Sequence, residues 1–388
     1  MFSARTSWNL TPNPFSVAQR EMLNAGKQIL DLTASNPTRV GLNYDQAAIM
    51  AALTQAAGLD YDPQPTGLLA ARQAVANYYR EQHDVFSVDP SKIVLTSSTS
   101  EAYSHIFHLL CNPEDEVLVP QPSYPLFDFL ADLSGVKLVP YSLFYDQQWQ
   151  IDFASLYQAI NHRTRAVLVV HPNNPTGSFA HRNDRSAFNL FCREYNLALV
   201  VDEVFLDYPH DGTARLTFAS NHDVLTFTLS GLSKVSGLPQ MKLAWMITSG
   251  PEDQVAAAVA RLEIITDTFL SPSAPVQLAA SMFLEQRKNI QPVLLNRMRV
   301  NLDELDRQLI AHPACRRLDV EGGWYAVLRV PRTQSDEELA IQILRGCCVL
   351  VHPGHFYDFP QDGFLVMSLI TPSDAFREGL RRMLEVLD

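Results

Sequence analysis

Two lysines, Lys234 and Lys242, lie in the stretch S-G-L-S-K-V-S-G-L-P-Q-M-K-L-A-W, which otherwise consists mainly of small and apolar residues. Most lysine side chains lie on solvated surfaces among polar neighbours. A desolvated lysine has a lowered pKa, and its neutral amine can then act as a nucleophile or a base. The setting of Lys234 therefore raises the question of what chemistry it performs, and why another cation follows.

Hydroxyl and aromatic side chains follow two short apolar stretches. Segment 96–101, T-S-S-T-S-E, has the composition of a helix N-terminus, where free backbone N–H groups bind phosphate. An ordinary N-cap with an acidic first turn accounts for the same residues. In P-Q-P-S-Y-P, segment 120–125, the prolines fix a rigid turn that directs Tyr124, although a packed surface tyrosine would also fit.

An amide and a carboxylate follow two further apolar stretches. Asn174, in H-P-N-N-P-T-G, can donate a directed amide hydrogen bond, although an ordinary Asn-Pro turn would read the same. Asp202 ends the run L-A-L-V-V, where a buried carboxylate is costly without a cationic partner. None of these signals decides the chemistry alone.

The pattern around these residues predicts a parallel sheet. Short runs that are apolar throughout alternate with segments of helical pattern, which is typical of strands covered by helices on both faces. Ligands bind such sheets at the carboxyl ends of the strands, where the polar residues above lie. The predicted strands are 92–96, 116–119, 166–170 and 197–201, and the predicted helices are 100–110 and 187–195.

Composition narrows the class of protein. The chain has 388 residues, 47% of them hydrophobic, and a net charge of −12, which argues against nucleic-acid or anionic-membrane binding. Its five cysteines show no CxxC spacing, and the N-terminus lacks the apolar core of a signal peptide. We therefore expect a cytoplasmic protein with reduced thiols. His105 and His108 are spaced like a metal pair, but no third ligand stands nearby, so we expect packing and no metal.

Taken in order, S-S-T-S-E-A, P-S-Y-P, N-N-P-T-G, V-V-D-E and S-G-L-S-K resemble the aspartate-aminotransferase superfamily, fold type I of the pyridoxal-phosphate enzymes. The resemblance runs from about Leu32 through the last helix. It implies an α/β large domain, residues 46–275, with a mostly parallel seven-stranded sheet flanked by helices. A smaller α+β domain would combine residues 1–45 with 276–388. The residue pattern itself predicts a long helix near 274–310, strands near 323–330 and 364–369, and a last helix in this part of the chain.

The resemblance also implies roles around the cofactor. Lys234 would hold pyridoxal phosphate as a Schiff base and then serve as the general base, while Asp202 would pair with the ring nitrogen. Asn174 would bond the ring oxygen O3′, and Tyr124 would stack on the ring. The residues implied at the phosphate and beside the lysine are Ser98, Thr99, Ser100, Ser233, Lys242 and, from the other subunit of a homodimer with shared sites, Tyr61.

Three positions depart from the family pattern. Lys242 stands where the family has an arginine, so it can meet the phosphate only as a point charge. Phe205 replaces a tyrosine, which removes a donor to O3′ and predicts a shift in the pH response of the cofactor absorbance. Val366 replaces the arginine that binds the substrate carboxylate. Arg39, after Asn36-Pro37, is the best substitute, with Arg5 behind it.

The sequence thus predicts a pyridoxal-phosphate-dependent aminotransferase that exchanges an amino group between an amino acid and a 2-oxo acid. The alternative is a lyase, decarboxylase or racemase on the same fold, since one fold hosts many reactions. A cofactor-binding regulator is less favoured because Lys234 and Asp202 are both present. Asn36, Arg39, Asn174 and His355 are the candidate substrate-binding residues, with His352 in the same loop as His355.

Overall fold

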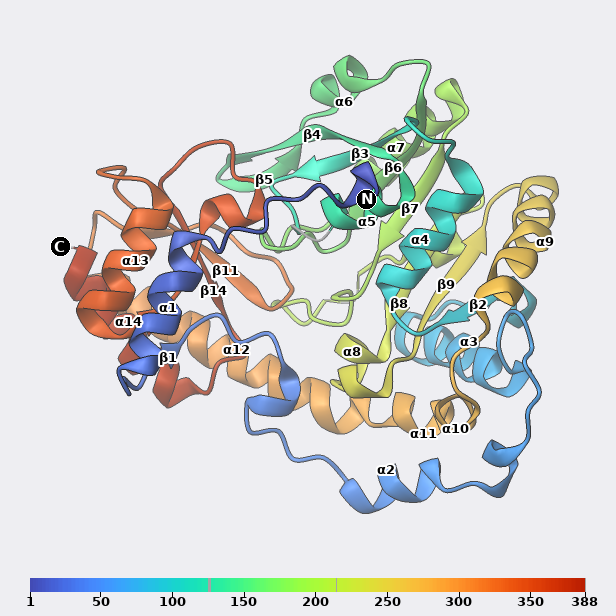
Figure 1. Ribbon diagram of the computed structural model, residues 1–388, viewed down its shortest axis with the longest axis horizontal. Helices are drawn as coiled ribbons and strands as arrows, with labels where there is room; N and C mark the ends of the chain where they lie inside the picture. The colour runs from blue at the N-terminus through green and yellow to red at the C-terminus, as the bar shows by residue number, and fades with distance from the viewer. Residues whose placement is uncertain (125–126, 214, 388) are drawn as a thin grey trace.

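The computed structural model describes the whole chain except residues 125–126, 214 and 388. Its centre is an eight-stranded sheet (Figure 1), in the order β2-β9-β8-β7-β6-β3-β4-β5. The pairs from β8 through β4 are parallel, whereas β9 and β5 run antiparallel to their neighbours. In sheet order the strands are Ile93–Thr96, Ala244–Ser249, Thr226–Gly231, Ala198–Asp202, Thr164–Val170, Glu116–Gln121, Lys137–Asp146 and Gln148–Ile151.

The predicted α/β class with a mostly parallel sheet is confirmed, but the predicted count of seven strands is one too low. This count came from the resemblance, whereas the apolar runs alone predicted β2, β3, β6 and β7. One strand that they did not predict is β5, which turns back on β4 through Gln147 in a left-handed conformation. A short polar edge strand carries no apolar run, so the pattern that identified the central strands does not detect it.

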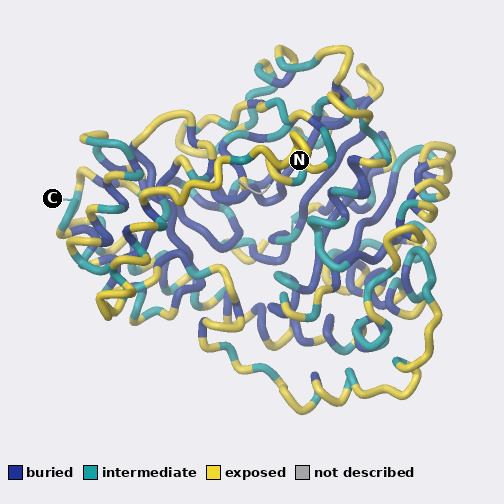
Figure 2. The backbone as a smooth tube through the Cα atoms, viewed as in Figure 1, coloured by how far each residue is buried: buried dark blue, intermediate teal, exposed yellow. Residues whose placement is uncertain are grey.

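Alternate residues of the central strands explain why these runs are apolar throughout. In β6, Leu168 packs toward α4 and α9, whereas its neighbours Val167 and Val169 pack toward α6 and α7. Both faces of the sheet are thus covered by helices, and β7, β8 and β9 are buried along their length (Figure 2). The helices on these faces are α4 (Thr99–Leu110), α5 (Phe127–Ser134), α9 (Glu252–Phe269), α6 (Phe153–Ala159) and α7 (Arg182–Tyr195).

A smaller antiparallel sheet lies beside the first, in the order β10-β11-β14-β13. The strands predicted near 323–330 and 364–369 are confirmed as β11 (Tyr325–Arg329) and β14 (Phe364–Ser368). The N-terminal segment contacts this unit, because β1 pairs with β12. The division into residues 46–275 and the remainder stays a prediction. The other elements here are α1 (Pro14–Asn24), β1 (Leu30–Asp31), β10 (Arg316–Arg317), α13 (Asp336–Cys347), β12 (Val349–Leu350), β13 (His352–Pro353) and α14 (Ser373–Leu387).

The single long helix predicted near 274–310 is wrong, because three consecutive helices occupy this range. They are α10 (Ala274–Leu278), α11 (Ala280–Glu285) and α12 (Arg287–Leu309). Cys347 ends α13, and Cys348 follows it in a left-handed conformation. No helix in the described ranges is long and apolar enough to cross a membrane.

Three further helices complete the regular structure. They are α2 (Gln46–Leu53), α3 (Leu69–His83) and α8 (Leu232–Val235), the last of which follows β8 directly. The segment around α2 is largely exposed (Figure 2). The short 3-10 turns are η1 (Ala4–Thr6), η2 (Pro37–Arg39), η3 (Ala56–Leu59), η4 (Pro90–Lys92), η5 (Phe218–Ser220), η6 (Pro239–Met241) and η7 (Gly354–Tyr357).

Candidate active site

A cavity of about 310 Å³ lies at the carboxyl ends of β6, β7 and β8. Each of these strands supplies residues at or just beyond its end, as expected for ligand sites of parallel sheets. The small sheet closes the cavity from the other side through Tyr325. The lining residues are Ser35, Ser98, Thr99, Ser100, Tyr124, Phe127, Val170, Asn174, Asp202, Val204, Phe205, Gly231, Ser233, Lys234, Pro239 and Tyr325.

Lys234 enters this cavity from α8, the single helical turn after β8. Its Nζ lies 4.5 Å from the centre of the Trp324 ring and 5.3 Å from that of Phe205. Burial lowers the pKa of Lys234 to about 8, and the nearby Asp202 carboxylate opposes this shift. The amine therefore loses its proton far more readily than a surface lysine does.

Asp202 ends β7 and is the anion of the cavity. Tyr103 on α4 donates its hydroxyl proton to Oδ2 at 2.8 Å, and the backbone N–H of Val204 donates to Oδ1 at 3.0 Å. Burial raises the pKa of Asp202, whereas these two donors and Lys234 favour its anionic form. Tyr103 thus fixes the orientation of the carboxylate.

The N-terminus of α4 opens onto the same cavity. Ser98 is the N-cap, and its hydroxyl accepts the backbone N–H of Glu101 at 3.2 Å. Glu101 in turn accepts the backbone N–H and the hydroxyl of Ser97, which completes the turn. The free end of the helix, with Ser98, Thr99 and Ser100 lining the cavity, combines N–H groups, hydroxyls and a positive dipole end suited to a phosphate.

Asn174, Tyr124 and Phe205 complete the walls. The side-chain oxygen of Asn174 is buried and has no hydrogen-bond partner among the described residues, which indicates a position for a polar ligand group. Tyr124 is 41% exposed on the rim, and the adjoining Pro125 lies outside the described residues. Phe205 is buried and packs against Trp324 at 5.3 Å, so its ring carries no donor into the cavity.

Five other predicted site residues do not line this cavity. Lys242 is exposed after η6, in a left-handed conformation, and precedes β9 instead of lying within the strand. Tyr61 is 81% exposed, and His355 is exposed on η7. Asn36 caps η2 by accepting the Thr38 N–H, and Arg39 ends the same turn. Their assignments stay predictions.

A second pocket of about 510 Å³ contains Arg39, Asn36 and His352, and it shares Ser35 with the Lys234 cavity. Arg39 makes no ion pair with any described residue. Val366 is fully buried in β14, where it pairs with Val327 and His352. Since β14 has the sequence F-L-V-M-S, shifting the correspondence by one residue would not supply a cation.

Sequence reasoning did not identify Trp324, Tyr325, Tyr103 or Ser35 as site residues. Trp324 and Tyr325 follow two glycines at the start of β11, a pattern that marks a close backbone approach. Tyr103 lies on the buried face of α4 and has no local signal of its own. Its contact with Asp202 joins residues 99 positions apart.

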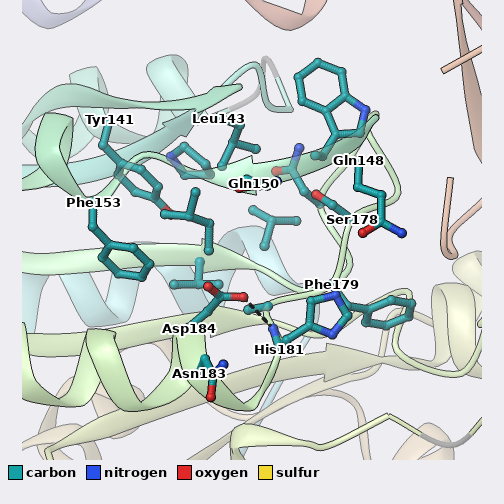
Figure 3. Close-up of a pocket in the computed structure, with 17 residues that line it drawn as sticks. Tyr141, Leu143, Gln148, Gln150, Phe153, Ser178, Phe179, His181, Asn183 and Asp184 are labelled. Atoms are coloured by element: carbon teal, nitrogen blue, oxygen red, sulfur yellow. Dashed lines mark hydrogen bonds between the residues drawn. The ribbon is translucent and has the colours of Figure 1, made fainter. Parts of the chain in front are cut away.

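A third cavity, of about 410 Å³, lies between the β4–β5 hairpin and the start of α7 (Figure 3). Tyr141, Phe153 and Phe179 contribute aromatic walls, and the backbone N–H of His181 donates to Asp184 at 2.8 Å. None of the predicted site residues lines this cavity in the described part of the chain, so we place the chemistry at Lys234.

Comparison with known proteins agrees with this site. The chain matches the aminotransferase class I and II family over residues 27–376, and it therefore belongs to that family. Members of this family use pyridoxal phosphate, so the protein is a pyridoxal-phosphate-dependent aminotransferase that exchanges an amino group between an amino acid and a 2-oxo acid. The predicted family, reaction and cofactor are confirmed.

Individual relatives are distant. The chain is 28% identical to an alanine aminotransferase of Mycobacterium tuberculosis, over 92% of this chain and 85% of the relative. It is 27% identical to the glutamate-pyruvate aminotransferase AlaA of Haemophilus influenzae, over 89% and 87% of the two chains. The fold is similar to that of an alanine aminotransferase from Pyrococcus furiosus, with a TM-score of 0.90, 23% identity, and coverage of 100% and 99%.

The residues of the Lys234 cavity fit this cofactor. An amine of lowered pKa, a buried carboxylate, a side-chain amide that can donate a hydrogen bond and a free helix N-terminus line one space of about 310 Å³. These groups match an aldehyde, a ring nitrogen, a ring oxygen and a phosphate, respectively.

Proposed function

We propose that the enzyme transfers the amino group of an amino acid with a small uncharged side chain, such as alanine, to a 2-oxo acid. The absence of any cation besides Lys234 among the described residues lining the cavity supports this class, because a second carboxylate would have no partner there. The names of the alanine aminotransferase relatives point in the same direction.

We assign the proton transfers to Lys234. Pyridoxal phosphate, when bound, supplies the aldehyde for the amine and the ring that accepts electrons from the substrate. With a pKa of about 8, roughly a tenth of the Lys234 amines are neutral at pH 7, against about one in 2,500 for an ordinary lysine. This neutral fraction is the base that removes the α-proton, and the resulting ammonium returns a proton to the product.

We also propose the other cofactor contacts. Asp202 would keep the ring nitrogen protonated, with Tyr103 holding the carboxylate in place. The N-terminus of α4 and Ser233 would bind the phosphate, helped by Lys242 and by Tyr61 of a second copy of the chain. Asn174 would bond the ring oxygen while Phe205 and Tyr124 pack against the ring.

We assign the substrate carboxylate to Arg39. Its pocket adjoins the Lys234 cavity at Ser35, and its guanidinium has no ion-pair partner among the described residues. Arg5, the second candidate, lines neither pocket and donates to the Leu133 carbonyl oxygen at 3.5 Å. Arg39 can offer a carboxylate two parallel N–H donors, as Val366 cannot.

We further propose a cytoplasmic homodimer with shared active sites. Large apolar side chains are exposed on η3 and its surroundings and at the end of α9, including Leu59, Tyr61, Phe269 and Leu270. Gly58 lies against Pro275, which follows Leu270 closely, so these side chains form one region of the surface. A second copy would cover this region and complete the phosphate site with Tyr61.

The test is to mix the purified, cofactor-loaded protein with single amino acids and to follow the cofactor absorbance without any 2-oxo acid. We expect alanine to bleach the band and pyruvate to restore it, with aspartate and glutamate much slower. Arg39→Lys should raise the KM for alanine more than it lowers kcat. Equal rates for alanine and aspartate would contradict the proposed substrate class. Continuous release of ammonia without an acceptor would contradict transamination.

A further inference from the structure

The helical turn that carries Lys234 is too short to be stable by itself. α8 has four residues, Leu232–Val235, and an isolated turn of helix is strongly unfavourable in water. Its last carbonyl groups have no partners within the helix and must be satisfied from elsewhere. The direction in which Lys234 enters the cavity therefore depends on whichever groups hold these carbonyls.

Tyr208 binds the first of these carbonyl groups. Its hydroxyl donates to the carbonyl oxygen of Lys234 itself at 2.6 Å. The same ring packs edge-on against Trp324 at 5.3 Å, and Trp324 lies 4.5 Å from the Lys234 Nζ. Tyr208 is fully buried, so it contacts both the backbone of Lys234 and the aromatic surface on which the amine rests.

Gln291 holds the second. Its amide nitrogen donates to the carbonyl oxygen of Val235 at 2.8 Å and to Asp207 Oδ2 at 2.5 Å. Both Gln291 and Asp207 are buried. Because one amide group has two N–H bonds, these two acceptors fix its orientation completely.

Asp207 is in turn held by α3. The Tyr78 hydroxyl donates to its carboxylate at 2.9 Å, and His83 Nε2 lies 3.1 Å from Oδ1. None of these groups touches the Lys234 cavity. Together they form a buried network of hydrogen bonds. At α8 this network ends on the carbonyl oxygen of Val235, the residue next to Lys234.

Gln291 also connects this turn with the small sheet, because α12 extends from beneath α8 toward that sheet (Figure 1). Further along the helix, Asn301 donates to the carbonyl oxygens of Leu369 and Thr371, each at 2.8 Å. One helix therefore contacts both the lysine turn and the segment that follows β14.

We propose that Gln291 and Tyr208 are positioning residues that set the approach of the Lys234 amine by holding the two carbonyls at the end of α8. This inference rests on the proposed role of Lys234, and it makes the buried Asp207 network a support for that geometry. Neither side chain takes part in the chemistry directly.

The test uses Gln291→Met, which keeps the length of the side chain and removes both donors, and Tyr208→Phe, which removes one hydroxyl. Gln308→Met on the same helix is the control, since the Gln308 side-chain amide donates to Glu304 and to the carbonyl oxygen of Arg377, neither of which belongs to the Asp207 network. Two readouts avoid turnover: the pH midpoint of the cofactor absorbance, and the pH profile of acetylation of Lys234 in cofactor-free protein, mapped by mass spectrometry.

We expect both Gln291→Met and Tyr208→Phe to shift these midpoints by about half a pH unit or more, and Gln308→Met to leave them unchanged. If the Gln291→Met protein does not fold, the pH midpoints of the Tyr208→Phe protein test the proposal. Wild-type midpoints in every folded variant, or an equal shift in Gln308→Met, would overturn the positioning role. Failure of the proposed function would give a different result, since Lys234 of the wild-type protein would then not carry the cofactor.

Discussion

Lys234 brings a potential cation into a cavity lined largely by aromatic and hydroxyl side chains, and among the described lining residues Asp202 alone can compensate its charge. Burial is the larger influence on its pKa, which falls to about 8. Burial also disfavours the charged form of Asp202 and raises its pKa. The Tyr103 hydroxyl and the Val204 N–H donate the hydrogen bonds that stabilise this anion. The chemistry thus depends on two opposite charges that share one confined space.

The lowered pKa of Lys234 makes the stability of the cofactor-free protein depend on pH. An unfolded chain keeps an ordinary lysine pKa of about 10.4, so between pH 8 and that value it binds a proton that the folded protein has released. The free energy of unfolding therefore rises with pH across this window, and the penalty is fully present below pH 8.

Lys234→Met should accordingly stabilise the cofactor-free protein at pH 7 by up to about 3 kcal/mol, with a gain that shrinks toward pH 10. Urea unfolding at several pH values measures this difference. Lys242→Met, which removes an exposed lysine that does not line the cavity, is the control. A Lys234→Met gain independent of pH would contradict the account.

Tyr103→Phe removes the hydroxyl that donates to Asp202 while keeping the ring that packs on Phe127 at 5.2 Å. A hydrogen bond to a charged group contributes about 1.5–3 kcal/mol, so we expect kcat to fall at least roughly tenfold with a small change in Tm. Tyr79→Phe, a buried tyrosine that accepts from Trp245 and does not contact Asp202, is the control. Equal kcat values in the two variants would argue against the role of Tyr103.

At the scale of elements, the lysine turn depends on how closely β8 approaches β9. A side chain at Gly231 would place its Cβ 2.9 Å from the Cβ of Ala244, closer than real contacts allow. The two strands and the start of α8 therefore require glycine at this position.

Gly231→Ala should lower the free energy of unfolding by about 1–3 kcal/mol and weaken cofactor retention, because the added methyl displaces α8. Ser230→Ala is the matched control one residue earlier. The Ser230 hydroxyl is buried without a partner among the described residues, so its removal should be close to neutral. Thermal unfolding measures the change in stability, and dialysis against buffer measures cofactor retention. A Gly231→Ala protein with wild-type stability and retention would contradict the tight approach of the two strands.

Much of this architecture was predictable from the sequence. The runs that became β6 and β7 are apolar on both faces, and each ends at a polar residue, so a periodicity argument finds both strand and site. Asn174 and Asp202 lie at or just beyond the ends of such strands, whereas Lys234 was assigned from its apolar setting and from the resemblance of the ordered motifs.

The remainder depended on contacts that have no local signal. The split of the range 274–310 into three helices and the edge strand β5 follow from tertiary packing, since neither changes the apolar pattern. Trp324 reaches Lys234 only because the small sheet packs onto the large one. Sequence spacing cannot reveal such long-range pairs.

At the scale of the whole molecule, Tyr61 is the residue whose predicted role requires a second chain. Mixing a Lys234→Ala protein with a Tyr61→Ala protein, each nearly inactive, should restore activity as subunits exchange. If each site combines both chains, random pairing gives one intact site in half of the dimers, about a quarter of wild-type activity. Mixing Lys234→Ala with Tyr124→Ala, a rim residue of the same chain's cavity, should restore no activity, because neither site of such a mixed dimer is intact.

Light scattering provides the independent check on assembly. A mass near twice the 43.5 kDa of one chain is expected for the cofactor-loaded protein. A monomer that retains full activity would contradict the shared site while leaving the Lys234 cavity untouched.

The most direct test of the central claim is chemical. The cofactor-loaded protein is reduced with borohydride, digested and mapped by mass spectrometry. We predict one pyridoxyl-phosphate adduct, on the peptide that contains Lys234, and none on Lys242. An unmodified Lys234, with the cofactor recovered free or attached to another lysine, would contradict the account.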